Sequence, residues 1–206
     1  MTGDLETTRR ALHGVAELLL AGPQHAACGE ISLRPTPGGF GTTHTPDLRI
    51  EGTDVVAGDR RAAIDGQTPR SLAAAIGIEA TGLGHVYQDG SGVDTDEVLS
   101  VDAEAAARIE TAYALGDAAL RAFSPGETPI LWPEHFDIGI SDEERRVNYG
   151  VSPGDGLIGI PYMYAGPWTP PPADDFWTQP FGAARPLPET AAEIVAFFEE
   201  AQRRLP

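Results

Sequence analysis

Apolar residues recur at helical spacing in four parts of the chain. This periodicity predicts a helix over residues 4–21, a short helix over 68–77, a main helix over 101–123 and a C-terminal helix over 188–205. Gly22 and Pro23 follow the first of these and are expected to end it. His13 falls beside Glu17 on the polar side of that helix, so we expect a solvated imidazole.

Between the helices the pattern changes to short runs of alternating apolar and polar residues, broken by turn residues. A strand meander is predicted over residues 29–64 and further strands over 129–166, followed by a proline-rich segment over 167–187. Strands grouped apart from helices indicate an α+β fold. We expect an antiparallel sheet system, made of the N-terminal meander and a C-terminal hairpin, with helices packed on one side. Residues 1–206 are expected to form a single domain, because this length suits one core.

The clearest hairpin lies within residues 130–151. Its strands would be Ile130–Ile140 and Arg145–Val151, joined by the polar residues 141–144. This register separates an apolar face from a polar face, which supports it, since a slip of one residue would mix the two. It predicts three cross-strand pairs: Phe136 with Tyr149, Asp137 with Asn148, and His135 with Gly150.

The charge of the chain limits its partners. The formal net charge is −17, and the 14 basic residues are all arginine. Nucleic acid and anionic membrane surfaces are therefore not expected as partners, because both are bound through basic contacts. The lack of lysine excludes Schiff-base chemistry, and the single cysteine excludes an internal disulfide. Without a long apolar run or a signal-like N-terminus, the expected protein is soluble and its expected compartment is the cytoplasm.

The chemistry-bearing residues gather in the hairpin. His135 and Asp137 occupy alternate strand positions and would share one face, which makes them the candidate catalytic residues. The same pair could hold a divalent ion, with His44 as a further candidate ligand, but no cofactor is predicted. The competing interpretation is structural, with Asp137 accepting hydrogen bonds from Asn148 or from nearby backbone.

Two classes of function follow, and the sequence leaves both open. In the first, the protein binds a small molecule, as an enzyme or otherwise, in a site of aromatic walls with few polar anchors. The candidate ligand-binding residues are Trp132, Asn148, Tyr149, Tyr162, Tyr164 and Trp168. In the second, the protein is a non-catalytic interaction module that uses its aromatic and proline-rich C-terminal third. An exposed patch formed by Trp168, Phe176 and Trp177 would favour this second class.

Three short motifs give a resemblance. They are Trp-Pro-Glu-His-Phe-Asp at 132–137, Asn-Tyr-Gly-Val-Ser-Pro-Gly-Asp at 148–155, and Pro-Tyr-Met-Tyr at 161–164. In these motifs the chain resembles a bacterial domain family of unknown function. The resemblance extends over about three quarters of the chain, through the meander and the main helix. It implies a shared fold and brings no established activity with it.

Overall fold

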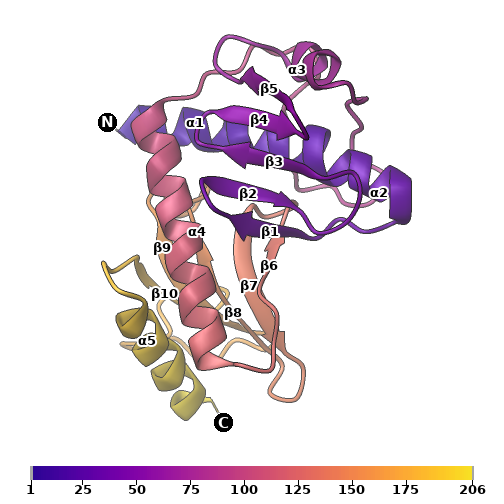
Figure 1. The fold of residues 1–206 in the computed structure, drawn as a ribbon. Coiled ribbons are helices and arrows are strands. Elements are labelled where there is room, and N and C mark those ends of the chain that lie inside the picture. The colour runs from indigo at the N-terminus through magenta and orange to yellow at the C-terminus, as the bar shows by residue number, and fades with distance from the viewer. Residues whose placement is uncertain (1, 206) are drawn as a thin grey trace. The chain divides into compact units, whose positions relative to one another are not determined.

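The computed structural model describes residues 2–205, whose contacts divide the chain into two compact units. Unit 1 comprises Met1–Glu110 and Leu131–Phe136, and unit 2 comprises Thr111–Ile130 and Asp137–Pro206. Within each unit the strands pair antiparallel and helices pack on one side of them (Figure 1). The predicted α+β class with an antiparallel sheet system is therefore confirmed. None of the helices in residues 2–205 is long and apolar enough to cross a membrane.

The first helix is longer than predicted and changes its winding. Helix α1 (Thr2–Val15) passes into a π-helical stretch, η1 (Ala16–Ala21), and then into α2 (Gly22–Cys28). The predicted end at Gly22 and Pro23 is wrong. Gly22 has helical angles, and Pro23 lies in the first turn of α2, directly after the π-helical stretch. The helix ends at Gly29, which has a φ of 82°.

The meander of unit 1 lies within the predicted range 29–64. Its strands are β1 (Leu33–Thr36), β2 (Gly39–Thr42), β3 (Leu48–Glu51), β4 (Asp54–Ala57) and β5 (Arg60–Ala63), each paired antiparallel with the next. Strand β6 (Ile130–Trp132) joins the other edge, where Leu131 pairs with Leu33 of β1. The π-helical stretch η1 lies against β2 and β3, and α3 (Pro69–Ile76) lies against β4 and β5.

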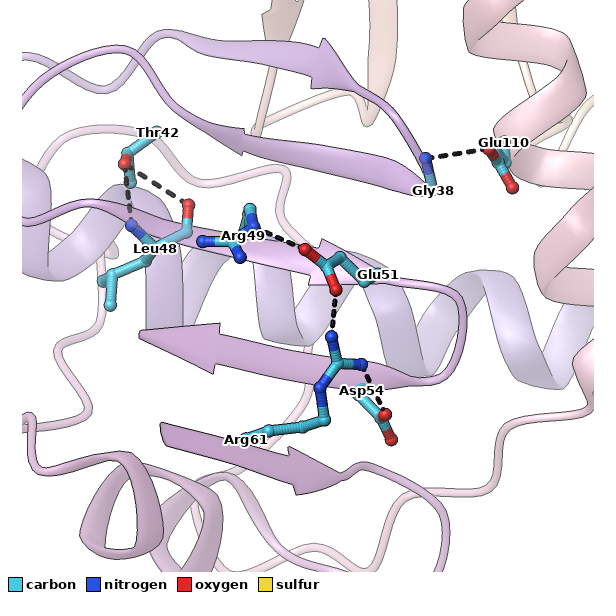
Figure 2. Close-up of polar contacts among 8 residues, drawn as sticks. All are labelled: Gly38, Thr42, Leu48, Arg49, Glu51, Asp54, Arg61 and Glu110. Atoms are coloured by element: carbon cyan, nitrogen blue, oxygen red, sulfur yellow. Dashed lines mark hydrogen bonds and ion pairs between the residues drawn. The ribbon is translucent and has the colours of Figure 1, made fainter. Parts of the chain in front are cut away.

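Ion pairs brace the exposed side of the meander, as Figure 2 shows. The Glu51 carboxylate receives Arg49 at 2.7 Å and also pairs with Arg61, which in turn reaches Asp54 at 2.8 Å. These residues come from three neighbouring strands, so the network ties β3, β4 and β5 together. Such exposed pairs contribute little stability singly.

In unit 2, four strands form the antiparallel order β10-β9-β8-β7. They are β7 (Asp137–Asp142), β8 (Val147–Ser152), β9 (Tyr162–Pro167) and β10 (Ala183–Pro186). The C-terminal part of α4 (Ala103–Phe123) and α5 (Ala191–Arg204) cover their apolar face. Tyr149 of β8 packs there between Phe123 of α4 and Phe198 of α5, with ring centroids 4.8 and 5.4 Å away.

The hairpin of β7 and β8 differs from the predicted register. Ile140 lies opposite Tyr149, and Asp142 lies opposite Val147, so the loop is 143–146 and not 141–144. The Asp142 carboxylate stabilises this loop, since it accepts the Arg145 N–H at 2.9 Å. The displacement is an even number of residues. For this reason Ile138, Ile140, Val147 and Tyr149 stay on one apolar face, although the predicted cross-strand pairs are wrong.

The predicted strand Ile130–Ile140 is also interrupted. Residues 133–136 form a turn between β6 and β7, closed by the Phe136 N–H on the Trp132 carbonyl at 2.8 Å. Phe136 has a φ of 53° there, which extended backbone does not allow. Phe136 therefore cannot be the cross-strand neighbour of Tyr149. It is buried, but in unit 1, against Phe40 at a centroid distance of 5.5 Å.

Candidate functional site

The structure separates the two candidate catalytic residues. His135 lies in the 133–136 turn, where its side chain is 63% exposed and its Nε2 is 3.6 Å from Glu134. Asp137 begins β7, is buried, and accepts the Tyr164 hydroxyl at 2.5 Å. The prediction that His135 and Asp137 share a strand face is wrong, because the turn ends where the strand begins.

The predicted ligand-binding residues fall into separate groups. Asn148 is exposed, and its side-chain oxygen accepts the Trp168 indole N–H at 3.2 Å and the Ser141 hydroxyl at 2.9 Å. Tyr149 is buried on the opposite face of β8, so it cannot line a site with Asn148. Trp132 ends β6 in unit 1 and is half-buried.

Tyr162 and Tyr164 stay together on one face of β9, with ring centroids 6.2 Å apart. The Tyr162 hydroxyl donates to Asp155 at 2.6 Å, as Tyr164 donates to Asp137. Burial, together with the neighbouring carboxylate, raises the pKa of both phenols above the usual value. Both phenols therefore stay protonated and act as donors to the two carboxylates. This arrangement stabilises the strands of unit 2.

The metal candidates do not come together either. His44 is exposed after β2, with its Nδ1 2.9 Å from the Thr43 hydroxyl. Within residues 2–205 no group of three or more His, Cys, Asp and Glu side chains is arranged to hold a metal ion.

A different polar group is assembled in unit 1, and we call it the Glu17 cluster. It consists of His13, Glu17, Tyr87, Ser91, Glu134 and His135. Glu17 lies in η1, and π-helical turns of this kind are frequent at functional sites. The wider winding changes the carbonyl partners, and the Leu18 carbonyl accepts the N–H of Thr81 at 2.9 Å. The segment that follows Thr81 is thereby held along the helix.

Glu17 places a carboxylate in the interior, with 10% of its side chain exposed. Its Oε1 accepts the Tyr87 hydroxyl at 3.0 Å, and its Oε2 accepts the Ser91 N–H at 2.9 Å and also the Ser91 hydroxyl. A Cβ at Gly90 would lie 2.0 Å from Oε1, so only glycine permits this approach of the backbone. Three donors compensate the loss of hydration that a buried carboxylate suffers.

His13 lies one helical turn before Glu17, with 15% of its side chain exposed. Its Nε2 is 2.6 Å from the Pro133 carbonyl oxygen and 4.0 Å from Glu17 Oε1. A carbonyl oxygen only accepts, so Nε2 carries the proton, and in the neutral ring Nδ1 is the basic atom. The Phe136 ring stacks on the imidazole at 5.1 Å, with an interplanar angle of 8°.

The surroundings lower the pKa of His13 below its usual value. Burial is the largest cause, because it disfavours the charged imidazolium. The nearby charges of His135 and Arg9 act in the same direction, whereas Glu17 and the Pro133 carbonyl oppose it. Burial and Glu17 also raise the pKa of Tyr87 above the usual range, so this phenol remains a donor. At neutral pH the cluster thus holds a neutral imidazole that can accept a proton.

The sequence interpretation missed the partners of His135 in this cluster. It treated His13 as solvated, and this is wrong because the 133–136 turn and the segment after Thr81 cover that side of the helix. A signal was present, however. Arg9, His13 and Glu17 follow one another at four-residue intervals, and Glu17 directly precedes the three leucines 18–20. A carboxylate at such a position is unusual unless donors meet it.

Comparison of the chain with protein-family models, with curated proteins and with solved structures gave no match. The function is therefore inferred from the geometry of the cluster alone.

Proposed function

We propose that the protein binds a small molecule at the Glu17 cluster of unit 1. The carrying observation is that the mostly buried, neutral His13 lies against the same turn that exposes His135. Titratable groups with perturbed protonation gather at functional sites more often than elsewhere, which supports the proposal. The left-handed backbone of Phe136 supports it further, because residues with strained backbone angles are concentrated at active sites and ligand-binding sites.

His13 is the group in this cluster suited to exchange a proton with a bound molecule. Its Nε2 is engaged by Pro133, so the exchange would take place at Nδ1. Glu17 would keep the segment that carries Tyr87 and Ser91 in place during binding. Phe136 is buried and stacks on the imidazole, so it holds the His13 ring in place for that exchange.

The interaction module is not carried forward as a second function. Phe176 and Trp177 are only 2% and 3% exposed, and Phe176 stacks on Phe197 of α5. Trp168 is 44% exposed but cannot form the expected patch with them. The acidic composition remains the reason to propose neither nucleic acid nor an anionic membrane as a partner. The cytoplasm is kept as the proposed compartment.

The His135→Ala variant tests the proposal. Because this side chain is largely exposed, its loss should change the free energy of unfolding by less than about 0.5 kcal/mol. A library of small molecules would be screened by following the imidazole NMR signals of His13 and His135 in the wild-type protein. We expect ligands that shift both signals and whose affinity falls in the variant. His44→Ala is the matched control, since that imidazole is exposed outside the cluster. A library in which no compound moves the His13 signal would contradict the proposal.

A further inference from the structure

Arg9 adds a positive charge to the edge of the Glu17 cluster. It precedes His13 by four residues in α1, so the two side chains lie on the same face of the helix. The guanidinium is close enough to His13 to influence the protonation of the imidazole. When the His135 imidazole is protonated, it adds a second positive charge near His13.

The Nη1 atom of Arg9 is buried, and no acceptor among the described residues binds it. An arginine stays charged at any physiological pH, and a buried N–H of a charged group is costly without an acceptor. Arg10 provides a contrast, because it is exposed and donates to Glu97. Among the described residues, the Arg9 Nη1 atom therefore has no acceptor, whereas the guanidinium of Arg10 has one.

Glu17 does not serve as the acceptor for Arg9, although it lies on the same face of the helix. Its two oxygens receive the hydroxyl of Tyr87 and two donors from Ser91. A guanidinium fork matches the oxygens of a carboxylate or a phosphate better than any other common group. An anionic oxygen group of a ligand would consequently supply the acceptor that the Arg9 Nη1 atom lacks among the described residues.

Resting on the proposed function, we infer that the small molecule carries a carboxylate or a phosphate group, which Arg9 binds beside His13 and His135. The net charge of −17 disfavours anions over the rest of the surface. Saturable binding of a simple anion would thus report on Arg9 and the two imidazoles beside it.

The test uses the full chain with sodium acetate and inorganic phosphate as separate probes, balanced with sodium chloride to constant ionic strength at fixed pH. The imidazole NMR signals of the five histidines are followed. We expect one probe or both to shift the His13 and His135 signals saturably and to leave His25, His44 and His85 unchanged. Acetate acting alone identifies a carboxylate ligand, and phosphate acting alone identifies a phosphate ligand.

Arg9→Gln should weaken this binding by at least about tenfold, the equivalent of one lost charged hydrogen bond. Arg108→Gln is the matched control, because it removes the same charge from an exposed position on α4 and should bind like the wild type. Arg9→Lys keeps the charge but loses the fork, and it should fall between the two. If Arg9→Gln does not fold, Arg9→Lys and the wild-type titration decide the question.

Two results would overturn the inference: neither anion moves the His13 signal, or Arg9→Gln binds as tightly as Arg108→Gln. Its failure is distinguishable from failure of the proposed function. If neither anion shifts the His13 signal but uncharged compounds do, the small-molecule site is supported and only the anionic nature of its ligand is wrong. If no compound of any charge shifts that signal, both proposals are wrong.

Discussion

Glu17 carries a carboxylate into the interior of unit 1, where Tyr87 and Ser91 bind it. The residues between Tyr87 and Ser91 therefore run along the helix, because Tyr87 and Ser91 are both hydrogen-bonded to Glu17. Val93, two residues beyond Ser91, fills the space left by Gly14 of α1. Glu17 thus helps to fix the course of a segment that has no regular secondary structure.

Glu17→Gln should lower the free energy of unfolding by about 1.5–3 kcal/mol. Two hydrogen bonds would then be accepted by a neutral amide oxygen instead of a charged carboxylate, and the NH₂ group would face another donor. For a chain of this length the loss of stability corresponds to a decrease in Tm of roughly 3–12 °C. Thermal denaturation followed by circular dichroism would measure it. Glu6→Gln, on the exposed side of α1, is the control and should melt like the wild type. Equal Tm values for the two variants would show that Glu17 does not fasten this segment.

His13 should make the stability of the protein depend on pH. Its pKa in the folded state lies below the usual 6.5, so the unfolded chain binds the proton more readily. The stability it contributes is complete above pH 6.5 and is lost as the pH falls from there toward the lower folded pKa. Urea unfolding at a series of pH values in this range should show that the free energy of unfolding depends less steeply on pH in His13→Gln than in the wild type. Glu17, Arg9 and His135 remain in this variant. NMR titration of the His13 ring gives the folded pKa directly, and a value above 6.5 would refute the argument.

Among the elements, the hairpin of β7 and β8 places its glycines beneath a tyrosine. Tyr164 of β9 lies over Gly150, and its hydroxyl is held by Asp137. A Cβ at Gly150 would stand 2.5 Å from the ring and 2.6 Å from the Ile138 carbonyl. Because Asp137 fixes the hydroxyl, the ring cannot move aside without breaking a buried hydrogen bond. Tyr164 therefore covers β8 at Gly150, the position that the predicted register placed opposite His135.

Gly150→Ala should accordingly destabilise the protein by about 1–3 kcal/mol through overpacking. Gly156→Ala is the matched control, since a Cβ there meets nothing within 4 Å. Chemical denaturation of both variants gives the comparison. A Gly150→Ala protein as stable as the Gly156→Ala protein would mean that β8 and β9 are not paired in this register.

At the scale of the whole molecule, 31 acidic residues against 14 arginines give a strongly negative chain. Local ion pairs such as Arg70 with Asp96 and Arg121 with Asp117 neutralise part of this charge. The excess still repels itself in the folded state, where the charges are closer together than in the unfolded chain. Screening by salt should therefore favour folding.

We expect the Tm at neutral pH to rise with sodium chloride over the range in which the Debye length falls from about 30 to 8 Å. Thermal melts at a series of salt concentrations would measure the rise. Arg9→Gln serves as the control for chloride bound at the Glu17 cluster, and it should show the same increase. A Tm that falls with salt would mean that the ion pairs outweigh the general repulsion.

The sequence by itself determined the elements and their class. Amphipathic spacing and turn residues act locally, so the helices over 68–77 and 101–123 and the strands of the 29–64 meander are found close to where the pattern predicts them. The two faces of the hairpin were also predictable, because period two survives any even displacement of the register.

Only the tertiary structure decided which polar side chains meet. The hydrogen bonds of Glu17 reach Tyr87 and Ser91, 70 and 74 residues away, and that of His13 reaches Pro133, 120 residues away. No spacing along the chain encodes such contacts, because they depend on how separate elements pack. The 133–136 turn shows the same limit: its motif looks like a strand, but the turn hydrogen bond from Phe136 to Trp132 and the burial of Phe136 against Phe40 and His13 give it another conformation. His135 therefore joins His13 and Glu17 in unit 1, while Asp137, two residues later, belongs to the strands of unit 2.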